Sequence, residues 1–265
     1  MNKGSYKAII VEGEVREPQV IESMLSVYFK EEQFKIISFP AEQNIYMLWK
    51  CLKKDEFETD IIEVVREYSN HAAKIIEGLS RDDFSEVYLF FDYDGHQENL
   101  LKEEDGNLVL SEMLETFDNE TELVKLYISY PMAEALRDFV PGQCSPATSC
   151  CWDLQKTGEY KTLTGKKSQY THIRNYLFEE WSEILRIFSM RVSCLFGNTK
   201  VFSFEEYRNV VFPLSIYKYQ QDYIQRETIF VLSAFPEFLL DYFKINFWKT
   251  HITYSKFRPE TCMKA

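Results

Sequence analysis

The segment Ser85–His96 constrains the fold more than any other part of the chain. It reads Ser-Glu-Val-Tyr-Leu-Phe-Phe-Asp-Tyr-Asp-Gly-His, so an unbroken apolar run ends at an Asp-x-Asp-Gly sequence. Such a run, rich in Val, Tyr and Phe, is typical of a strand that is buried on both faces in a parallel sheet. Ligands bind at the carboxyl ends of these strands, where Asp92 and Asp94 suit a hard cation such as Mg²⁺. The plainer alternative is an Asp-Gly turn with solvated side chains.

Three further apolar runs of strand length alternate with segments of helical spacing in the first half of the chain. The runs are Lys7–Val11, Phe34–Phe39 and Leu123–Ser129. The alternation predicts an α/β fold, with a parallel sheet flanked by helices over residues 1–140. Residues 141–265 are expected to add a basic loop and a mainly helical C-terminal extension. Within them, Pro and Gly residues predict that the chain as far as Gly165 is a long loop.

The charge balance restricts the ligands that the chain can bind. Thirty Lys and Arg against 42 Asp and Glu give a net charge of −12, so a nucleic-acid contact requires a local basic patch. One such patch spans residues 156–174, where aromatic residues and His172 are interleaved with basic ones. This combination suits a phosphate backbone with unstacked bases, although a solvated loop is the alternative. Its basic residues are Lys156, Lys161, Lys166, Lys167 and Arg174.

Targeting and cysteine signals indicate a cytoplasmic protein. The N-terminus lacks the apolar core of a signal peptide, and no apolar run approaches the roughly 18 residues of a membrane span. Six cysteines in a chain of this length do not resemble a disulfide framework, so reduced thiols are expected. The cluster of Cys144, Cys150 and Cys151 lacks the second ligand pair of a zinc site.

Carboxylates also follow two of the other predicted strands. Glu12 comes directly after Ile9–Val11, and Glu134 lies one turn beyond the strand that ends at Ser129. The carboxyl ends of parallel strands share one edge, so these acids are expected to converge with Asp92 and Asp94. A Mg²⁺ or Mn²⁺ ion would relieve their repulsion and could activate a phosphodiester for hydrolysis. His96 is either a proton shuttle or phosphate contact, or an exposed turn residue.

Together these motifs resemble the TOPRIM domain of topoisomerases, primases and several nucleases. Val11-Glu12-Gly13-Glu14 and Asp92-Tyr93-Asp94-Gly95 carry the resemblance, which covers roughly residues 6–139. The form Glu12-Gly13-Glu14-x-x-Glu17-Pro18, with Pro131-x-x-Glu134, is similar to stand-alone TOPRIM-like proteins of phage defence, the RloB-like group. The resemblance implies a Mg²⁺-dependent nuclease in an anti-phage system, often beside an ATPase partner. Glu12, Asp92 and Asp94 would then be catalytic metal ligands, joined by Glu134, and Lys166, Lys167, Arg174 and His96 would contact the substrate.

Two other interpretations remain open. Apolar-apolar-Asp92-x-Asp94-Gly also resembles the nucleophile motif of haloacid-dehalogenase-like phosphatases, in which the first aspartate attacks phosphorus. That interpretation leaves Glu12-Gly13-Glu14 unexplained. The second alternative is an inactive TOPRIM-like scaffold that binds a partner protein. The sequence leaves the choice between RNA and DNA open and is compatible with a homo-oligomer.

Overall fold

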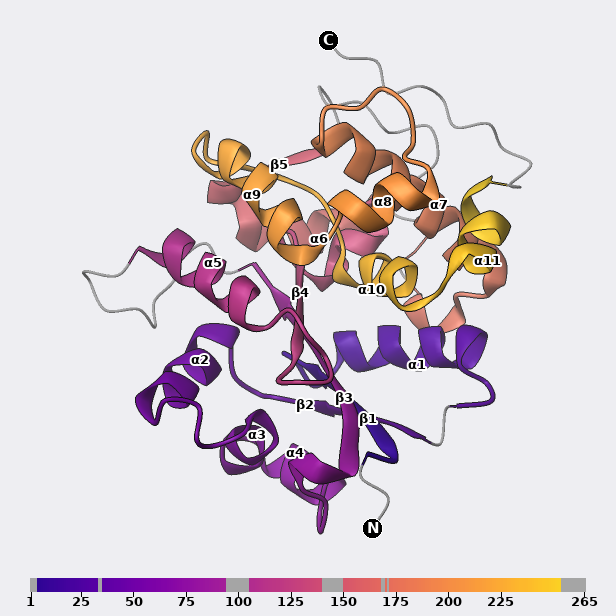
Figure 1. Cartoon of the computed structure of the whole chain (residues 1–265). Helices are drawn as coiled ribbons and strands as arrows, with labels where there is room; N and C mark the ends of the chain where they lie inside the picture. The colour runs from indigo at the N-terminus through magenta and orange to yellow at the C-terminus, as the bar shows by residue number, and fades with distance from the viewer. Residues whose placement is uncertain are drawn as a thin grey trace. The chain divides into compact units, whose positions relative to one another are not determined.

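The chain folds into two compact units, residues 1–127 and 128–265. This computed structural model describes residues 4–32, 35–93, 105–139, 150–167, 170 and 172–253. The first unit contains most of a parallel sheet together with its helices, and the second is mainly helical (Figure 1).

The predicted parallel sheet is present and has four strands. These are β1 (Tyr6–Val11), β2 (Ile36–Pro40), β3 (Phe84–Asp92) and β4 (Lys125–Ser129), in the order β2-β1-β3-β4. β1 is a central strand, because Ile9 pairs in parallel with Ser38 on one side and with Tyr88 on the other. Ala8 to Val11 are at most 1% exposed, which explains why this strand is apolar without alternation.

Helices cover both faces of the sheet in the first unit. They are α1 (Arg16–Tyr28), α2 (Ile45–Lys54), α3 (Ile61–Tyr68), α4 (Asn70–Ile75), the short 3₁₀ helix η2 (Arg81–Asp83) and α5 (Gly106–Thr116). Figure 1 shows α1 on one face, with α3 and α4 on the other. Asp60 is the N-cap of α3, and its carboxylate accepts hydrogen bonds from the backbone N–H groups of Ile62 and Glu63.

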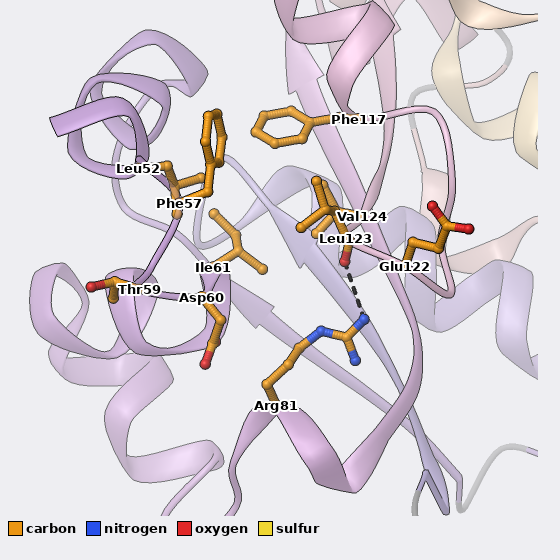
Figure 2. Close-up of a pocket in the computed structure, with 10 residues that line it drawn as sticks. All are labelled: Leu52, Phe57, Thr59, Asp60, Ile61, Arg81, Phe117, Glu122, Leu123 and Val124. Atoms are coloured by element: carbon orange, nitrogen blue, oxygen red, sulfur yellow. Dashed lines mark hydrogen bonds between the residues drawn. The ribbon is translucent and has the colours of Figure 1, made fainter. Parts of the chain in front are cut away.

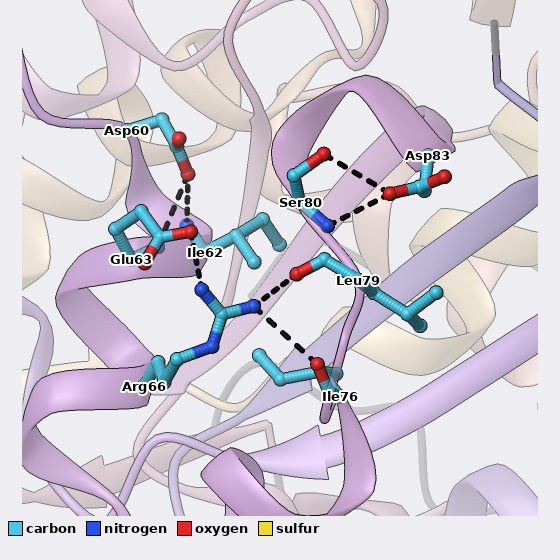
Figure 3. A network of polar contacts seen from close by, with 8 residues as sticks. All are labelled: Asp60, Ile62, Glu63, Arg66, Ile76, Leu79, Ser80 and Asp83. Atoms are coloured by element: carbon cyan, nitrogen blue, oxygen red, sulfur yellow. Dashed lines mark hydrogen bonds and ion pairs between the residues drawn. The ribbon is translucent and has the colours of Figure 1, made fainter.

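A break at Ser69 divides the segment after Asp60, which has the spacing of one helix, into α3 and α4. The Ser69 hydroxyl accepts a hydrogen bond from the backbone N–H of Ala72 and so caps α4. Arg66, near the end of α3, pairs with Glu63 and donates to the backbone carbonyls of Ile76 and Leu79 (Figure 3). One guanidinium therefore joins the end of α3 to the carbonyl groups that follow α4.

The second unit is mainly helical, as expected. Its elements are η3 (Ala133–Asp138), β5 (Cys151–Asp153), η4 (Leu154–Lys156), α6 (Thr157–Lys167), η5 (Ile173–Asn175), α7 (Phe178–Leu195), α8 (Phe204–Val210), α9 (Pro213–Ile224), β6 (Thr228–Phe230), α10 (Ala234–Tyr242), α11 (Ile245–Trp248) and the π-helical turn η6 (Lys249–Thr253). β5 and β6 form a two-stranded antiparallel sheet.

The expectation of a loop as far as Gly165 is wrong for residues 151–165, which form β5, η4 and most of α6. Two glycines weaken the helix propensity of α6, but tertiary packing compensates for them. Tyr160 is fully buried and donates a hydrogen bond to Asp138, and an Arg137 nitrogen lies 3.3 Å from the Cβ position of Gly165. Residues 140–149 lie outside the described part of the chain.

The two units divide between Tyr127 and Ile128, inside β4, whereas the sequence indicated a division at 140. Contacts made directly after that point explain the difference. Tyr130 forms an antiparallel bridge with Leu232, and the Ser129 hydroxyl accepts a hydrogen bond from the backbone N–H of Ala234. The end of β4 therefore packs with the C-terminal helices.

Two expectations from the sequence concern the oxidation state of the cysteines and the presence of membrane-spanning helices. Cys51, Cys150 and Cys151 are free, but Cys194 is disulfide-bonded, so the expectation of reduced thiols is wrong for Cys194. Within the described residues, no helix combines the length and the apolar character needed to cross a membrane.

Candidate functional site

The strand order places a topological switch point at the carboxyl ends of β1 and β3. The chain leaves β1 toward β2 on one side, and it leaves β3 toward β4 on the other side. In open parallel sheets, ligands bind outside the strand ends at such a switch point. Glu12 directly follows β1 and Asp92 ends β3, so both residues of the predicted metal site lie at this position.

Glu12 and Asp92 are in direct contact. The Glu12 carboxylate Oε2 accepts a hydrogen bond from the Asp92 backbone N–H, at an N–O distance of 3.0 Å. The Glu12 backbone N–H donates to the carbonyl of Phe90 at 3.1 Å, which continues the β1–β3 pairing past the last strand residue. Both residues are partly exposed. The Glu12 carboxylate therefore meets the backbone of Asp92, and the predicted convergence of the four carboxylates stays a prediction.

Gly13 lets a second carboxylate approach the same turn. Glu17, in the first turn of α1, is only 8% exposed. A Cβ atom on residue 13 would lie 3.0 Å from Glu17 Oε2 and 3.3 Å from Oε1. A larger residue here would require the Glu17 carboxylate to move by a few tenths of an ångström, so glycine leaves room for that carboxylate.

A third group of ligand atoms lies at the same edge and was missed by the sequence analysis. Glu14, Glu42 and His71 each offer one ligand atom, and these atoms all lie within 4.8 Å of one another. Glu42 follows β2, and its backbone N–H donates to the carbonyl of Glu12 at 3.2 Å. The strand-end rule that selects Glu12 and Asp92 also applies to β2 and could have found Glu42. No motif indicates His71.

Glu14 and Glu42 titrate as a pair. Their carboxylates are hydrogen-bonded to each other, which raises the pKa of Glu14 and lowers the pKa of Glu42 from the ordinary value of 4.5. Repulsion from the Glu42 charge raises the pKa of Glu14 further, and a hydrogen bond from Ser69 contributes to the lowering for Glu42. The interaction between the two carboxylates thus shifts their pKa values in opposite directions.

Three other residues were predicted to belong to the site: Asp94, His96 and Glu134. Asp94 and His96 lie outside the described residues. Glu134 belongs to the second unit, on η3, where it is buried and its Oε1 lies 3.2 Å from Lys161 Nζ. This ion pair links η3 to α6.

The basic candidates lie in the second unit. Lys166 is exposed on α6 and forms no ion pair with a described residue. Lys167 ends α6, but its side chain is outside the described part. Arg174 is exposed on η5. Lys156, also exposed, pairs with Asp153 at 3.3 Å. The predicted patch is therefore partly neutralised by local ion pairs.

A small cavity of about 110 Å³ lies at the opposite, amino-terminal edge of the sheet (Figure 2). Its walls include the rings of Phe57 and Phe117, which meet edge to face at 6.4 Å, and Arg81, which donates to the Leu123 carbonyl at 3.2 Å. Burial lowers the pKa of Arg81. A cavity of this volume is too small for a nucleotide, so the carboxyl edge remains the candidate site.

Comparisons of the chain with protein-family models, with curated proteins and with solved structures gave no match. The resemblance to TOPRIM proteins therefore stays a prediction from Glu12-Gly13-Glu14 and Asp92-x-Asp94.

Proposed function

We propose that this chain is a divalent-metal-dependent nuclease that hydrolyses phosphodiester bonds in RNA or DNA. The observation that carries the proposal is the contact between the Glu12 carboxylate and the Asp92 backbone N–H, at the switch point of the sheet. The phosphatase alternative gives Glu12 no part in the reaction. An ATPase partner and a role in phage defence rest on the sequence resemblance alone.

The donor set at this edge fits Mg²⁺ or Mn²⁺, which prefer carboxylate oxygens. Glu12 and Asp92 would hold the ion, together with Asp94, which follows two residues later. A bound ion would polarise the phosphodiester and lower the pKa of a water molecule. The hydrogen bond from Asp92 fixes the orientation of the Glu12 carboxylate before any ligand binds, which reduces the cost of assembling the site.

The substrate contact is assigned to α6 and η5, where exposed Lys166 and Arg174 carry positive charge in a protein of net charge −12. Glu134 is retained as a candidate, although its pairing with Lys161 supports a structural role for this residue.

The test is cleavage of labelled RNA and DNA pools by the purified full-length chain with Mg²⁺, with Mn²⁺ and with a chelator. Asp92→Asn should lower the cleavage rate at least about 100-fold, since the negative charge of one metal ligand is removed. The matched control is Glu112→Gln, an exposed carboxylate on α5 that pairs with Lys53. Cleavage that survives chelator, or that is equal in wild type and Asp92→Asn, would contradict the proposal.

A further inference from the structure

We propose that Glu14, Glu42 and His71 form a second cation site, which binds a divalent transition-metal ion such as Mn²⁺ or Zn²⁺. Its ligands do not include Glu12 or Asp92, and the site does not require the chain to be a nuclease. Its ligands come from the turn after β1, the connection after β2 and the first turn of α4. An ion there would join three segments that are far apart in the sequence.

The distances between the ligand atoms suit a single ion. The three atoms lie within 4.8 Å of one another, and His71 Nδ1 is 3.9 Å from Glu14 Oε1. Ligands bound at about 2.1 Å from one ion lie about 3 to 4.2 Å apart. Small side-chain rotations would therefore complete the coordination, and the exposure of the Glu14 and His71 side chains, 52% each, leaves room for water ligands.

A buried serine lies beside one of the ligands. Ser69 is fully buried and lies next to Glu42, and its hydroxyl accepts a hydrogen bond from the backbone N–H of Ala72. Ser69 is also the N-cap of α4, the helix that carries His71. Ser69 therefore lies beside Glu42 and caps the helix that carries His71, and residues behind the ligands commonly orient them in metal sites.

The chemistry of the group selects the class of ion. Two carboxylates in contact repel each other unless a proton or a cation lies between them. An imidazole nitrogen favours transition ions, whereas Mg²⁺ prefers oxygen ligands alone. The ion would also stiffen the turn that carries Glu12, because Glu14 lies only two residues beyond it.

Metal titration of the metal-stripped, full-length chain tests the site. Mn²⁺ is the main probe, followed by electron paramagnetic resonance and calorimetry, with Mg²⁺ as the comparison ion. His71→Ala and Glu42→Gln should each weaken Mn²⁺ binding at this site by at least about 10-fold, as expected when a ligand is removed. The rise in melting temperature with Mn²⁺ should shrink in parallel.

Two control variants separate this site from the proposed nuclease centre. His172→Ala removes an exposed histidine in the second unit, and Asp92→Asn removes a ligand of the nuclease centre. Both should keep the His71-dependent binding. Unchanged Mn²⁺ binding in His71→Ala, or binding that only Asp92→Asn abolishes, would overturn the second site. Loss of cleavage in Asp92→Asn with binding at His71 intact would support both proposals.

Discussion

The Glu12 carboxylate accepts a hydrogen bond from the backbone N–H of Asp92, 80 residues later in the chain, at an N–O distance of 3.0 Å. The contact links the ends of two adjacent parallel strands at the edge where ligands of α/β sheets bind. It gives Glu12 two separable roles, since the acceptor oxygen supports the structure and the negative charge is available for a cation.

Two substitutions of Glu12 separate these roles. Glu12→Gln keeps an oxygen that can accept the Asp92 N–H, so its stability should lie within about 0.5 kcal/mol of wild type. Glu12→Ala leaves that N–H without its acceptor and should cost about 1–2 kcal/mol. Both variants should lose metal-dependent cleavage. Urea denaturation with nuclease assays provides the measurement, and a fully active Glu12→Gln would show that the charge is not used.

Gly13→Ala should destabilise the chain by about 1 kcal/mol, because the buried Glu17 carboxylate would have to move away from the new methyl group. The same substitution in a Glu17→Ala background should be neutral or slightly stabilising, since only the entropy of the unfolded chain is then reduced. A double-mutant cycle in urea measures the coupling. Equal costs in both backgrounds would show that the Glu17 contact is not the reason for the glycine.

Arg66→Ala should cost about 2 kcal/mol, because the guanidinium bonds the Ile76 and Leu79 carbonyls and pairs with Glu63. Arg66→Lys should recover less than half of this stability, since an ammonium group cannot reproduce the planar fork. Thermal and urea unfolding measure both effects. Arg226→Ala, at an exposed arginine, is the control. An equal loss of stability in the two alanine variants would contradict the role of Arg66.

His251 should make stability depend on pH. It is 2% exposed, and burial lowers its pKa from 6.5 to about 4, with a further contribution from the charge of Arg186. The folded chain keeps His251 neutral, whereas the unfolded chain binds a proton below about pH 6.5. Unfolding therefore takes up a proton, and this part of the stability is lost as the pH falls from about 6.5 toward 4.

The comparison of wild type with His251→Asn isolates this effect from the titration of carboxylates. The stability difference between the two proteins should shrink as the pH falls over that range, with a slope of no more than one proton per unfolding event. Urea unfolding at half-unit pH steps above 4.5 gives the measurement. A difference that stays constant with pH would rule out the titration of His251.

Lys166→Ala should weaken nucleic-acid binding and make it less dependent on salt. The slope of log K against log salt concentration should become shallower by about 0.7–0.9 for each phosphate that Lys166 neutralises. Stability should be unchanged, because Lys166 is exposed and has no ion pair with a described residue. Lys200→Ala, another exposed lysine of the second unit, is the control. Equal effects of the two variants on fluorescence-anisotropy titrations would place the nucleic-acid contact elsewhere.

The sequence alone determined the sheet and the edge of it at which Glu12 and Asp92 lie. Unbroken apolar runs such as Ile9–Val11 and Val87–Phe91 can be buried only in strands that are covered on both faces. Acids placed directly after such strands must lie at one edge if the strands are parallel. The cap of α3 could also be predicted from the sequence, since Asp60 precedes the apolar residues of the helix and caps it in the structure.

Only the tertiary structure decided which polar groups meet. Glu14, Glu42 and His71 belong to three segments without a shared motif, and strand order with the break at Ser69 brings them together. Packing against η3 also makes α6 a helix despite Gly158 and Gly165. The physical reason is the same in both cases: apolar periodicity encodes which residues are buried, whereas contacts between distant polar residues depend on how the elements pack.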